Sequence, residues 1–336
     1  MASLVPHRYK LALTRAMQPL SPVVLERRLV QKPWGGRALA DCPGIPLPAD
    51  QAIGESWELY DRPEGSSALR GGGTLRELME ADAQGVLGSR VAPTRGGRFP
   101  LLLKFIDARE RLSVQVHPGD EQARRHDDEG KDEAWIVLRT GPKASIVRGF
   151  RPGTARTDVE AAAAAGGAIE ALLHEFTPKV GDVVPVPHGV VHVIGPDVVV
   201  FEVQRNSDLT FRFWDWGRGR ELHVAEALEA VRIGDEGPAT ALPVPIDQRG
   251  DWLLRTPQFR VRRLRFDGPA TIGTEGSFKV MTVIDGMAAI GWRSGGVHPP
   301  IPLRAGETLL VPAAVPAVFV SPIGPLTCFW IDGERG

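Results

Sequence analysis

Short apolar runs recur along the chain and are separated by Gly, Pro and polar residues. Many of their residues are β-branched or aromatic, a composition that predicts β-strands. The clearest runs are Pro100–Ile106, Ala134–Leu138, Val198–Val203, Gln258–Leu264 and Lys279–Ile284. Many short strands with turn signals between them are typical of a β-barrel or β-sandwich. We therefore expect a mainly-β fold.

Three segments instead carry helical patterns. Thr74–Glu77 is a capping box that opens a helix through Met79 to Leu87. Thr157 opens an alanine-rich stretch expected to end near Phe176, with a break at Gly166 and Gly167. Glu221–Arg232 carries Leu and Ala at helical spacing. These helices are predicted as insertions among the strands.

One turn sequence occurs twice in the chain. Val180–Pro187 reads VGDVVPVP and Ala305–Pro312 reads AGETLLVP, at a constant offset of 125 residues (306 − 181 and 312 − 187). Upstream, the segment 137–141 resembles 282–286. In the second copy Ala317 takes the place of His192, and Phe278 that of Glu133. The repeat predicts two barrels. Only the first has metal-ligand residues, and the boundary lies between residues 234 and 251.

Length and charge narrow the possible functions. The 336 residues are enough for two domains. A net charge of −1 gives no global field that would favour nucleic acid or an anionic membrane. No apolar run reaches the roughly 20 residues of a membrane helix, and residues 1–20 are expected to be an N-terminal extension rather than a secretion signal. The sequence predicts no oligomeric state.

The chain has two cysteines, Cys42 and Cys328. Two are too few for a disulfide framework, so reduced thiols in the cytoplasm are the simplest interpretation. A single bridge stays open as an alternative.

The run Leu112–Pro118 (LSVQVHP) contains the first candidate metal ligands. Gln115 and His117 are two residues apart on a predicted strand, so both side chains project from one face. Glu133 and His192 follow later in the chain. Two imidazoles, a carboxylate and an amide oxygen form a ligand set for a divalent metal such as zinc, with room for water or substrate.

The alternative for any one of these histidines is a buried polar group satisfied by hydrogen bonds. We apply that interpretation to His126, His174, His223 and His298. His188 is a separate case, because it precedes a turn glycine and is expected at the barrel mouth.

Lys104 lies in an apolar strand, where an unpaired ammonium is costly to bury. A water-filled pocket with a phosphate to contact would remove that cost. Ser113 shares a strand face with Gln115, so its hydroxyl is expected in the same cavity, although a serine bonded to the backbone is the simpler alternative.

Arg212 alternates with Phe211 and Phe213, and Asp208 precedes it by four residues. An inward arginine beside a metal is suited to stabilise developing negative charge. A structural ion pair between Asp208 and Arg212 is the alternative, and spacing alone leaves it open.

Several spaced motifs resemble those of one family, the type I mannose-6-phosphate isomerases of the cupin superfamily. The segment 181–192 is similar to the second cupin motif. The resemblance extends from about Pro33 to Gly336. The motifs that carry it are Gly54–Leu59, Pro100–Asp107, Leu112–Pro118, Gly130–Glu133 and Glu202–Asp208, the last continuing to Arg218.

The resemblance implies two cupin-type jelly-roll β-barrels. The first would span residues 21–240, with helical insertions near 74–89 and 154–176. The second would span 241–336, degenerate and without metal ligands. One Zn²⁺ per chain is implied at Gln115, His117, Glu133 and His192.

The same resemblance assigns roles to the charged residues. It implies that Lys104 and Ser113 bind a sugar phosphate and that Lys131 is a catalytic residue close to the zinc-bound substrate. It also implies that Arg212 is catalytic, with Asp208 as its positioning neighbour and a member of the substrate-binding set. Arg205 departs from the family, which usually has an uncharged residue there. It is expected to point away from Gln204, but would alter substrate choice if it faced the pocket.

The expected reaction is the interconversion of mannose 6-phosphate and fructose 6-phosphate, with proton transfer through a cis-enediol. The proton-abstracting group stays open among a metal-bound water, Glu133, Lys131 and the vicinity of His192. A non-catalytic sugar-phosphate sensor on the same fold is the alternative from another class. An iron-dependent cupin oxygenase is a third interpretation and would be expected to use a His-rich ligand set.

Overall fold

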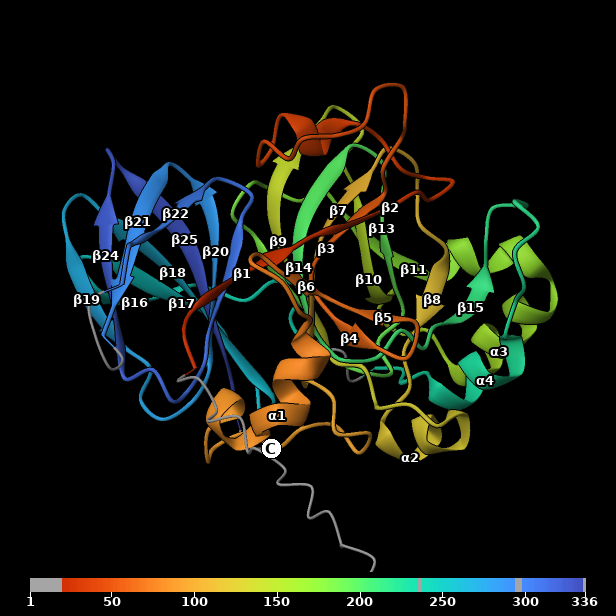
Figure 1. The fold of residues 1–336 in the computed structure, drawn as a ribbon. Coiled ribbons are helices and arrows are strands. Elements are labelled where there is room, and N and C mark those ends of the chain that lie inside the picture. Colours follow the sequence, from red (N-terminus) through yellow and green to blue (C-terminus); the bar gives the residue numbers. More distant parts are fainter. Residues whose placement is uncertain (1–19, 235–236, 294–297, 335–336) are drawn as a thin grey trace, which may run out of the picture.

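The N-terminal half of the molecule contains a six-stranded and a five-stranded antiparallel sheet (Figure 1). The computed structural model describes residues 20–234, 237–293 and 298–334. The six-stranded sheet has the order β12-β9-β14-β7-β3-β2. Its strands are β2 (Arg28–Val30), β3 (Glu55–Leu59), β7 (Leu101–Ala108), β9 (Glu133–Thr140), β12 (Val183–Val186) and β14 (Val198–Arg205).

The five-stranded sheet faces this sheet and has the order β11-β10-β13-β8-β15. Its strands are β8 (Val114–Val116), β10 (Ile146–Phe150), β11 (Leu173–Phe176), β13 (His192–Ile194) and β15 (Phe211–Trp214). A two-stranded ribbon, β4 (Asp61–Arg62) with β5 (Gly65–Ser66), lies beside them.

The C-terminal half, drawn in blue in Figure 1, contains an eight-stranded and a four-stranded sheet. The larger has the order β16-β17-β18-β25-β20-β23-β1-β6, so it takes in two strands from near the N-terminus. Its strands are β1 (Val23–Glu26), β6 (Ala68–Leu69), β16 (Val244–Asp247), β17 (Gly250–Arg255), β18 (Phe259–Phe266), β20 (Lys279–Asp285), β23 (Thr308–Val311) and β25 (Leu326–Gly333). The smaller, in the order β19-β24-β21-β22, contains β19 (Ala270–Gly273), β21 (Met287–Trp292), β22 (Ile301–Arg304) and β24 (Ala317–Pro322).

Three hydrophobic cores lie between neighbouring pairs of the four large sheets. One joins the five-stranded to the six-stranded sheet, as in the contact set of Val116, Trp135 and Val193. A second joins the six-stranded to the eight-stranded sheet and includes Phe105, Phe201 and Phe329, whose rings pack 5.0 and 5.2 Å apart in pairs. The third lies between the eight-stranded and four-stranded sheets. Strands buried on both faces, such as β7, are apolar almost throughout for this reason.

The predicted mainly-β character is confirmed, and the five predicted strands are β7, β9, β14, β18 and β20. The helix predicted to begin after Thr74 is α1 (Leu75–Leu87). The hydroxyl of Thr74 accepts a hydrogen bond from the backbone N–H of Glu77, and the Glu77 carboxylate accepts one from the backbone N–H of Thr74.

The alanine-rich prediction was partly wrong. α3 (Arg156–Ala164) has Ala155 rather than Thr157 as its N-cap residue, and Asp158 accepts a hydrogen bond from the backbone N–H of Ala155. It does break at Gly166, where η3 (Gly166–Leu172) starts. The last residues then pair with β10 as strand β11, since a sheet edge was there to accept them.

The remaining helices are short. α4 (Val224–Ala230) is shorter than predicted, and α2 (Asp120–Ala123), η1 (Ala38–Ala40) and η2 (Arg124–His126) lie in connecting segments. Among the described helices, none has the length and apolar character needed to cross a membrane. The extension expected over residues 1–20 lies, apart from Leu20, outside the described residues.

The internal repeat corresponds to matching strands. β12 and β23 occupy the two copies at the offset of 125 residues, and Ala317 opens β24 as His192 opens β13. The strand register corrects one position of the predicted repeat. Val186 pairs with Glu133, whereas Val311 pairs with Lys279, so Lys279 rather than Phe278 takes the place of Glu133. Lys279 is fully buried and forms an ion pair with Asp332, 2.6 Å away.

A buried carboxylate lies on β3 near the second half of the molecule. Glu58 is completely buried, accepts a hydrogen bond from Ser56 at 2.6 Å, and lies 3.5 Å from Arg27. Its second oxygen, Oε2, has no hydrogen-bond partner. Burial raises the pKa of Glu58 from 4.5 to about 7, against the opposing charge of Arg27.

Replacing Glu58 with Gln should therefore change how stability depends on pH. Between pH 4.5 and 7 the folded protein keeps a proton that the unfolded chain releases, so the wild type loses stability as pH rises. E58Q lacks this loss and should gain about 3 kcal/mol relative to wild type between pH 4 and pH 8. Urea unfolding at both pH values measures the difference, and the exposed Glu80 replaced by Gln is the control. A difference that does not change with pH would contradict the argument.

Candidate metal centre and active site

A cavity lies between the five-stranded and six-stranded sheets, and strand pairing places the side chains on its two walls. On one wall Gln115 pairs with His192 and with Arg212 on the neighbouring strands. On the other wall Glu202 pairs with Lys104 and with Trp135. Residues far apart in the sequence are thereby aligned across two facing sheets.

Three of the four expected metal ligands form a buried cluster. His117 Nε2 lies 3.3 Å from Glu133 Oε2, and His192 Nε2 lies 3.5 Å from Glu133 Oε1. One ligand atom from each residue can be chosen so that all lie within 4.8 Å of one another. Gln115, the fourth, has its amide Nε2 3.1 Å from His192 Nε2.

Both imidazoles are oriented by backbone carbonyls outside the cluster. His117 Nδ1 lies 2.9 Å from the carbonyl of Leu209, and His192 Nδ1 lies 2.8 Å from that of Val190. A carbonyl can only accept, so each Nδ1 carries the proton and each Nε2 presents its lone pair to the cluster. This arrangement is the usual one for metal-binding histidines.

The protonation states also suit a metal. Burial lowers the pKa of His192 to about 3 and lowers that of His117, so both rings are neutral near pH 7. Although burial opposes ionisation, the Lys131 ammonium holds the pKa of Glu133 well below its usual value. Metal ligation requires neutral imidazole and ionised carboxylate.

Gln115, the fourth proposed ligand, can also present an oxygen atom to a metal. Its Oε1 accepts a hydrogen bond from the Ser113 hydroxyl at 2.9 Å. A half-turn of the amide would point Oε1 at the cluster, and the same hydroxyl could then accept from Nε2, since a serine both donates and accepts. The four residues therefore fit a divalent metal.

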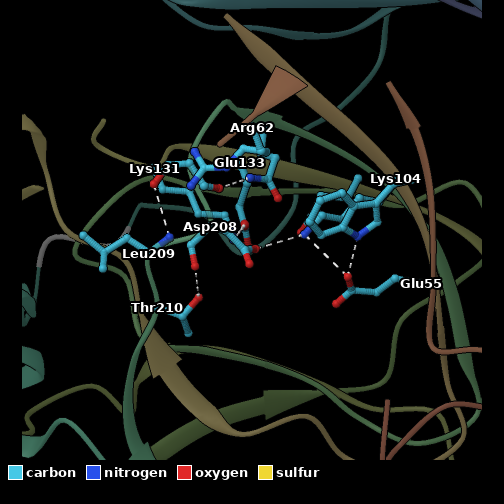
Figure 2. A network of polar contacts seen from close by, with 12 residues as sticks. Glu55, Arg62, Lys104, Lys131, Glu133, Asp208, Leu209 and Thr210 are labelled. Atoms are coloured by element: carbon cyan, nitrogen blue, oxygen red, sulfur yellow. Dashed lines mark hydrogen bonds and ion pairs between the residues drawn. The ribbon is translucent and has the colours of Figure 1, made fainter. Parts of the chain in front are cut away.

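Lys131 lies against this cluster. Its Nζ is 2.9 Å from Glu133 Oε2 and 3.1 Å from His117 Nε2, as Figure 2 shows for Lys131 and Glu133. The atoms proposed to bind the metal thus contact a cation, the Lys131 ammonium, in this structure. Lys131 also lines the cavity, so its ammonium is placed between the cluster and the space for substrate.

Lys104 lines the cavity as expected, but carboxylates surround its ammonium. Its Nζ lies 3.5 Å from Asp208 and 3.7 Å from both Glu55 and Glu202, and 4.9 Å from the ring centre of Trp57 (Figure 2). These charges raise the pKa of Lys104 in spite of burial. Against the effect of burial, Lys104 lowers the pKa of Asp208 to about 2.

The ion pair between Asp208 and Arg212, which the spacing had left open as an alternative, is not formed, because Asp208 is directed to Lys104 instead. Within the described part of the chain, Arg212 has no ion-pair partner, and its Nε is buried without a hydrogen bond. Burial and the neighbouring Arg220 lower the pKa of Arg212. The guanidinium of Arg212 therefore lines the cavity with no carboxylate within ion-pair distance in the described chain.

Sequence reasoning missed four charged residues of the cavity lining, which are Lys32, Glu55, Glu202 and Arg220. Glu202 accepts a hydrogen bond from Trp135 Nε1 at 3.0 Å, while its Oε2 is buried without one. Burial and the nearby Glu133 raise its pKa to about 7. The argument that singled out Lys104, an ionisable group in an apolar strand, would have found Glu202 as well.

Arg205 points away from the cavity, as the strand alternation predicted. It contacts Asp120, Glu129 and Asp132 rather than the cavity lining. His188 pairs with Asp132 at 2.8 Å. The other four histidines that the structure describes lie outside the ligand cluster, among them His174, which contacts the Arg148 carbonyl, and His298, which stacks on Trp292.

Comparison with known proteins supplies an independent line of evidence. The family described as phosphomannose isomerase type I, catalytic domain, matches residues 23–135. A putative mannose-6-phosphate isomerase of Bacillus subtilis is 31% identical over 315 residues, covering 88% of this chain and 94% of the relative. The mannose-6-phosphate isomerase of Streptococcus mutans is 30% identical over 307 residues, covering 88% and 93%.

A solved structure agrees. The crystal structure of the mannose 6-phosphate isomerase from Bacillus subtilis superposes with a TM-score of 0.81 at 29% identity, covering 94% of this chain and all of that one. Relatives at least 30% identical over most of both chains establish the family, and so the chain belongs to the type I phosphomannose isomerase family.

Proposed function

We propose that this protein interconverts mannose 6-phosphate and fructose 6-phosphate through a cis-enediol. The observation that carries the proposal is the cavity itself. Gln115 and Glu133, two of the proposed metal ligands, line the same space as Arg212, which has no direct ion pair in the described chain. The relatives named above are mannose-6-phosphate isomerases, which supports this reaction. Both cysteines are free, in keeping with a cytoplasmic enzyme.

The proposed fold assignment is two cupin-type barrels. The five- and six-stranded sheets would form the first, over residues 21–240, and the eight- and four-stranded sheets the second, over 241–336. Matching strand orders support this division, with β1 and β6 added to the second sheet pair. Lys279 and Ala317 at the places of Glu133 and His192 support a second barrel without a metal.

Zinc is the metal we propose, held by Gln115, His117, Glu133 and His192. When bound, it would polarise substrate oxygens as a Lewis acid. The one carboxylate in the set leaves a net positive charge at the site, which suits a substrate that becomes anionic during reaction.

Substrate binding is divided among the charged residues. Lys104 has three carboxylate neighbours, so a phosphate dianion would be repelled there. We assign Lys104 and Asp208 to sugar hydroxyls instead. Ser113 keeps its proposed phosphate contact, now with Arg220, which lines the cavity. Fixing the phosphate would hold the reacting carbons near the proton-transfer group.

Arg212 is assigned to the developing enediolate. Its guanidinium has no direct ion pair in the described chain, so it can respond to charge that appears only during reaction. Lys131, beside the ligand cluster, is proposed to hold a substrate oxygen close to the metal.

Glu202 joins the candidates for proton transfer. It is buried, lines the cavity, and has a pKa near 7, where a carboxyl can both take and return a proton. It competes with Lys131, Glu133 and a metal-bound water for this role. A sensor on the same fold would need no such group.

Removing the metal should abolish turnover. Treatment with a chelator is expected to inactivate the enzyme and added Zn²⁺ to restore it in a coupled mannose 6-phosphate assay. His192→Ala should lose bound zinc and at least about 100-fold in kcat, since changes outside the ligand shell already cost about 10–100-fold. His174→Ala, outside the cluster, is the control. Full turnover in metal-free protein would refute the metal's role.

Replacing Arg212 with Gln should lower kcat by about 10²–10³-fold with a smaller change in KM, because the charge is needed mainly in the transition state. Arg212→Lys should recover part of the rate. Steady-state kinetics in both directions measure this. If the wild type binds mannose 6-phosphate without turning it over, the protein is a sensor.

Replacing Glu202 with Gln should lower kcat by about 10²–10⁴-fold. The exchange of deuterium between C2 of mannose 6-phosphate and solvent, followed by NMR, should fall in parallel. Glu55→Gln removes another carboxylate from Lys104 and is the matched control. Equal losses in the two variants would assign Glu202 to the positioning of Lys104 rather than to proton transfer.

A further inference from the structure

The segment between two of the proposed ligands folds back on itself. It begins after His117 on the β8 side and ends at Glu133 on β9, and we call residues 119–132 the ligand loop. α2 and η2 lie within it. The backbone N–H of Lys131 bonds to the carbonyl of Pro118 at 3.0 Å, so the two ends of the loop meet.

Arg205, at the end of β14, reaches this loop from outside. Its Nη2 lies 2.7 Å from Asp120 and 3.5 Å from Glu129, and its Nη1 lies 3.7 Å from Asp132. Its backbone N–H also bonds to the carbonyl of Asp132 at 3.0 Å. One guanidinium thus holds the first and last turns of the loop together.

The ligand loop leaves space for the Arg205 side chain at Gly130. Asp120 Oδ1, which Arg205 contacts, also accepts from the backbone N–H of Gly130 at 2.9 Å. A Cβ on Gly130 would lie 2.9 Å from Arg205 Nη1 and 2.7 Å from the backbone nitrogen of Asp120. A larger residue at position 130 would therefore force the loop and the arginine apart.

Asp132 extends the contact toward a third ligand. It accepts hydrogen bonds from His188 at the backbone N–H, 3.0 Å, and at Nδ1, 2.8 Å. His188 lies in the turn that leads into β13, which His192 opens. The side chain of Asp132 contacts Arg205 and His188, while its neighbours Lys131 and Glu133 belong to the cavity.

We propose that Arg205 is a positioning residue that fixes Lys131 and Glu133 by clamping the ligand loop. The inference rests on the proposed roles of those two residues. The guanidinium is only 16% exposed, so its loss would leave three carboxylates close together without their shared cation. Their repulsion would open the loop, and the adjacent ligand and ammonium would move with it.

Other arginines contact the same loop without reaching both its ends. Arg62 forms a bidentate pair with Asp128, and Arg95 contacts Glu129, both in the middle of the segment. Arg125 points outward to Glu229 on α4. Arg125 therefore offers a matched control, because its replacement also removes one cation and one ion pair from the loop.

The test compares Arg205→Gln with Arg125→Gln. Zinc affinity is measured by competition with a chromophoric chelator, the ligand geometry from the absorption spectrum of the Co²⁺-substituted protein, and kcat and KM on mannose 6-phosphate. R205Q should bind zinc at least about 10-fold more weakly, shift the Co²⁺ bands and lower kcat more than it raises KM. R125Q should match the wild type, and Arg205→Lys should lie between.

Asp120→Asn provides a second test of the proposal in case R205Q does not fold. Its side chain is 48% exposed, and Asn keeps the acceptor for the Gly130 N–H while losing the charge that Arg205 contacts. It should change zinc affinity in the same direction by a smaller factor. If R205Q and D120N lower only the melting temperature, with zinc affinity and Co²⁺ spectrum unchanged, the proposal is overturned. A wild type without isomerase activity would instead refute the proposed function, while the metal measurements would still decide the role of Arg205.

Discussion

The carboxylate of Glu133 is shared by groups that come from separate parts of the chain. His117 and His192 lie on either side of it, and Lys131, two residues earlier in the ligand loop, also contacts it. A buried carboxylate with so many partners fixes the distance between the five-stranded and six-stranded sheets at this end of the cavity. The hydrogen bonds of both imidazoles to backbone carbonyls then set which nitrogen faces it. The geometry of the proposed metal site therefore depends on these contacts to Glu133.

Charge is distributed unevenly around the cavity, and that unevenness separates the roles of its cations. Lys104 is neutralised by three carboxylates, whereas Arg212 faces the cavity without an ion pair in the described chain. A neutralised cation can orient hydroxyl groups but adds little attraction for an anion. An unneutralised one in a site of low dielectric interacts strongly with charge that develops nearby.

The second half of the molecule supports this site without sharing its chemistry. Phe105 and Phe201, on the sheet that carries Lys104 and Glu202, pack against Phe329 from the C-terminal half. β1 crosses from the N-terminal segment into the C-terminal sheet and ties the two halves further. Lys279 and Asp332 form a buried ion pair where the first half has its ligand carboxylate, so a salt bridge within the chain replaces the polar cluster there.

The sequence by itself determined the local features, because they depend on neighbouring residues. Apolar runs gave the strands β7, β9 and β14, the Thr74–Glu77 box gave the start of α1, and the repeat gave the match of β12 with β23. The motif residues Gln115, His117, Glu133 and His192 were likewise recognisable in order along the chain. Only the tertiary structure decided what depends on strand register and on facing sheets. It paired Asp208 with Lys104 instead of Arg212, brought Glu202 into the cavity, and turned Arg205 onto the loop between two ligands. Contacts of this kind join residues distant in sequence, and local pattern contains no information on which of several possible partners a charged side chain meets.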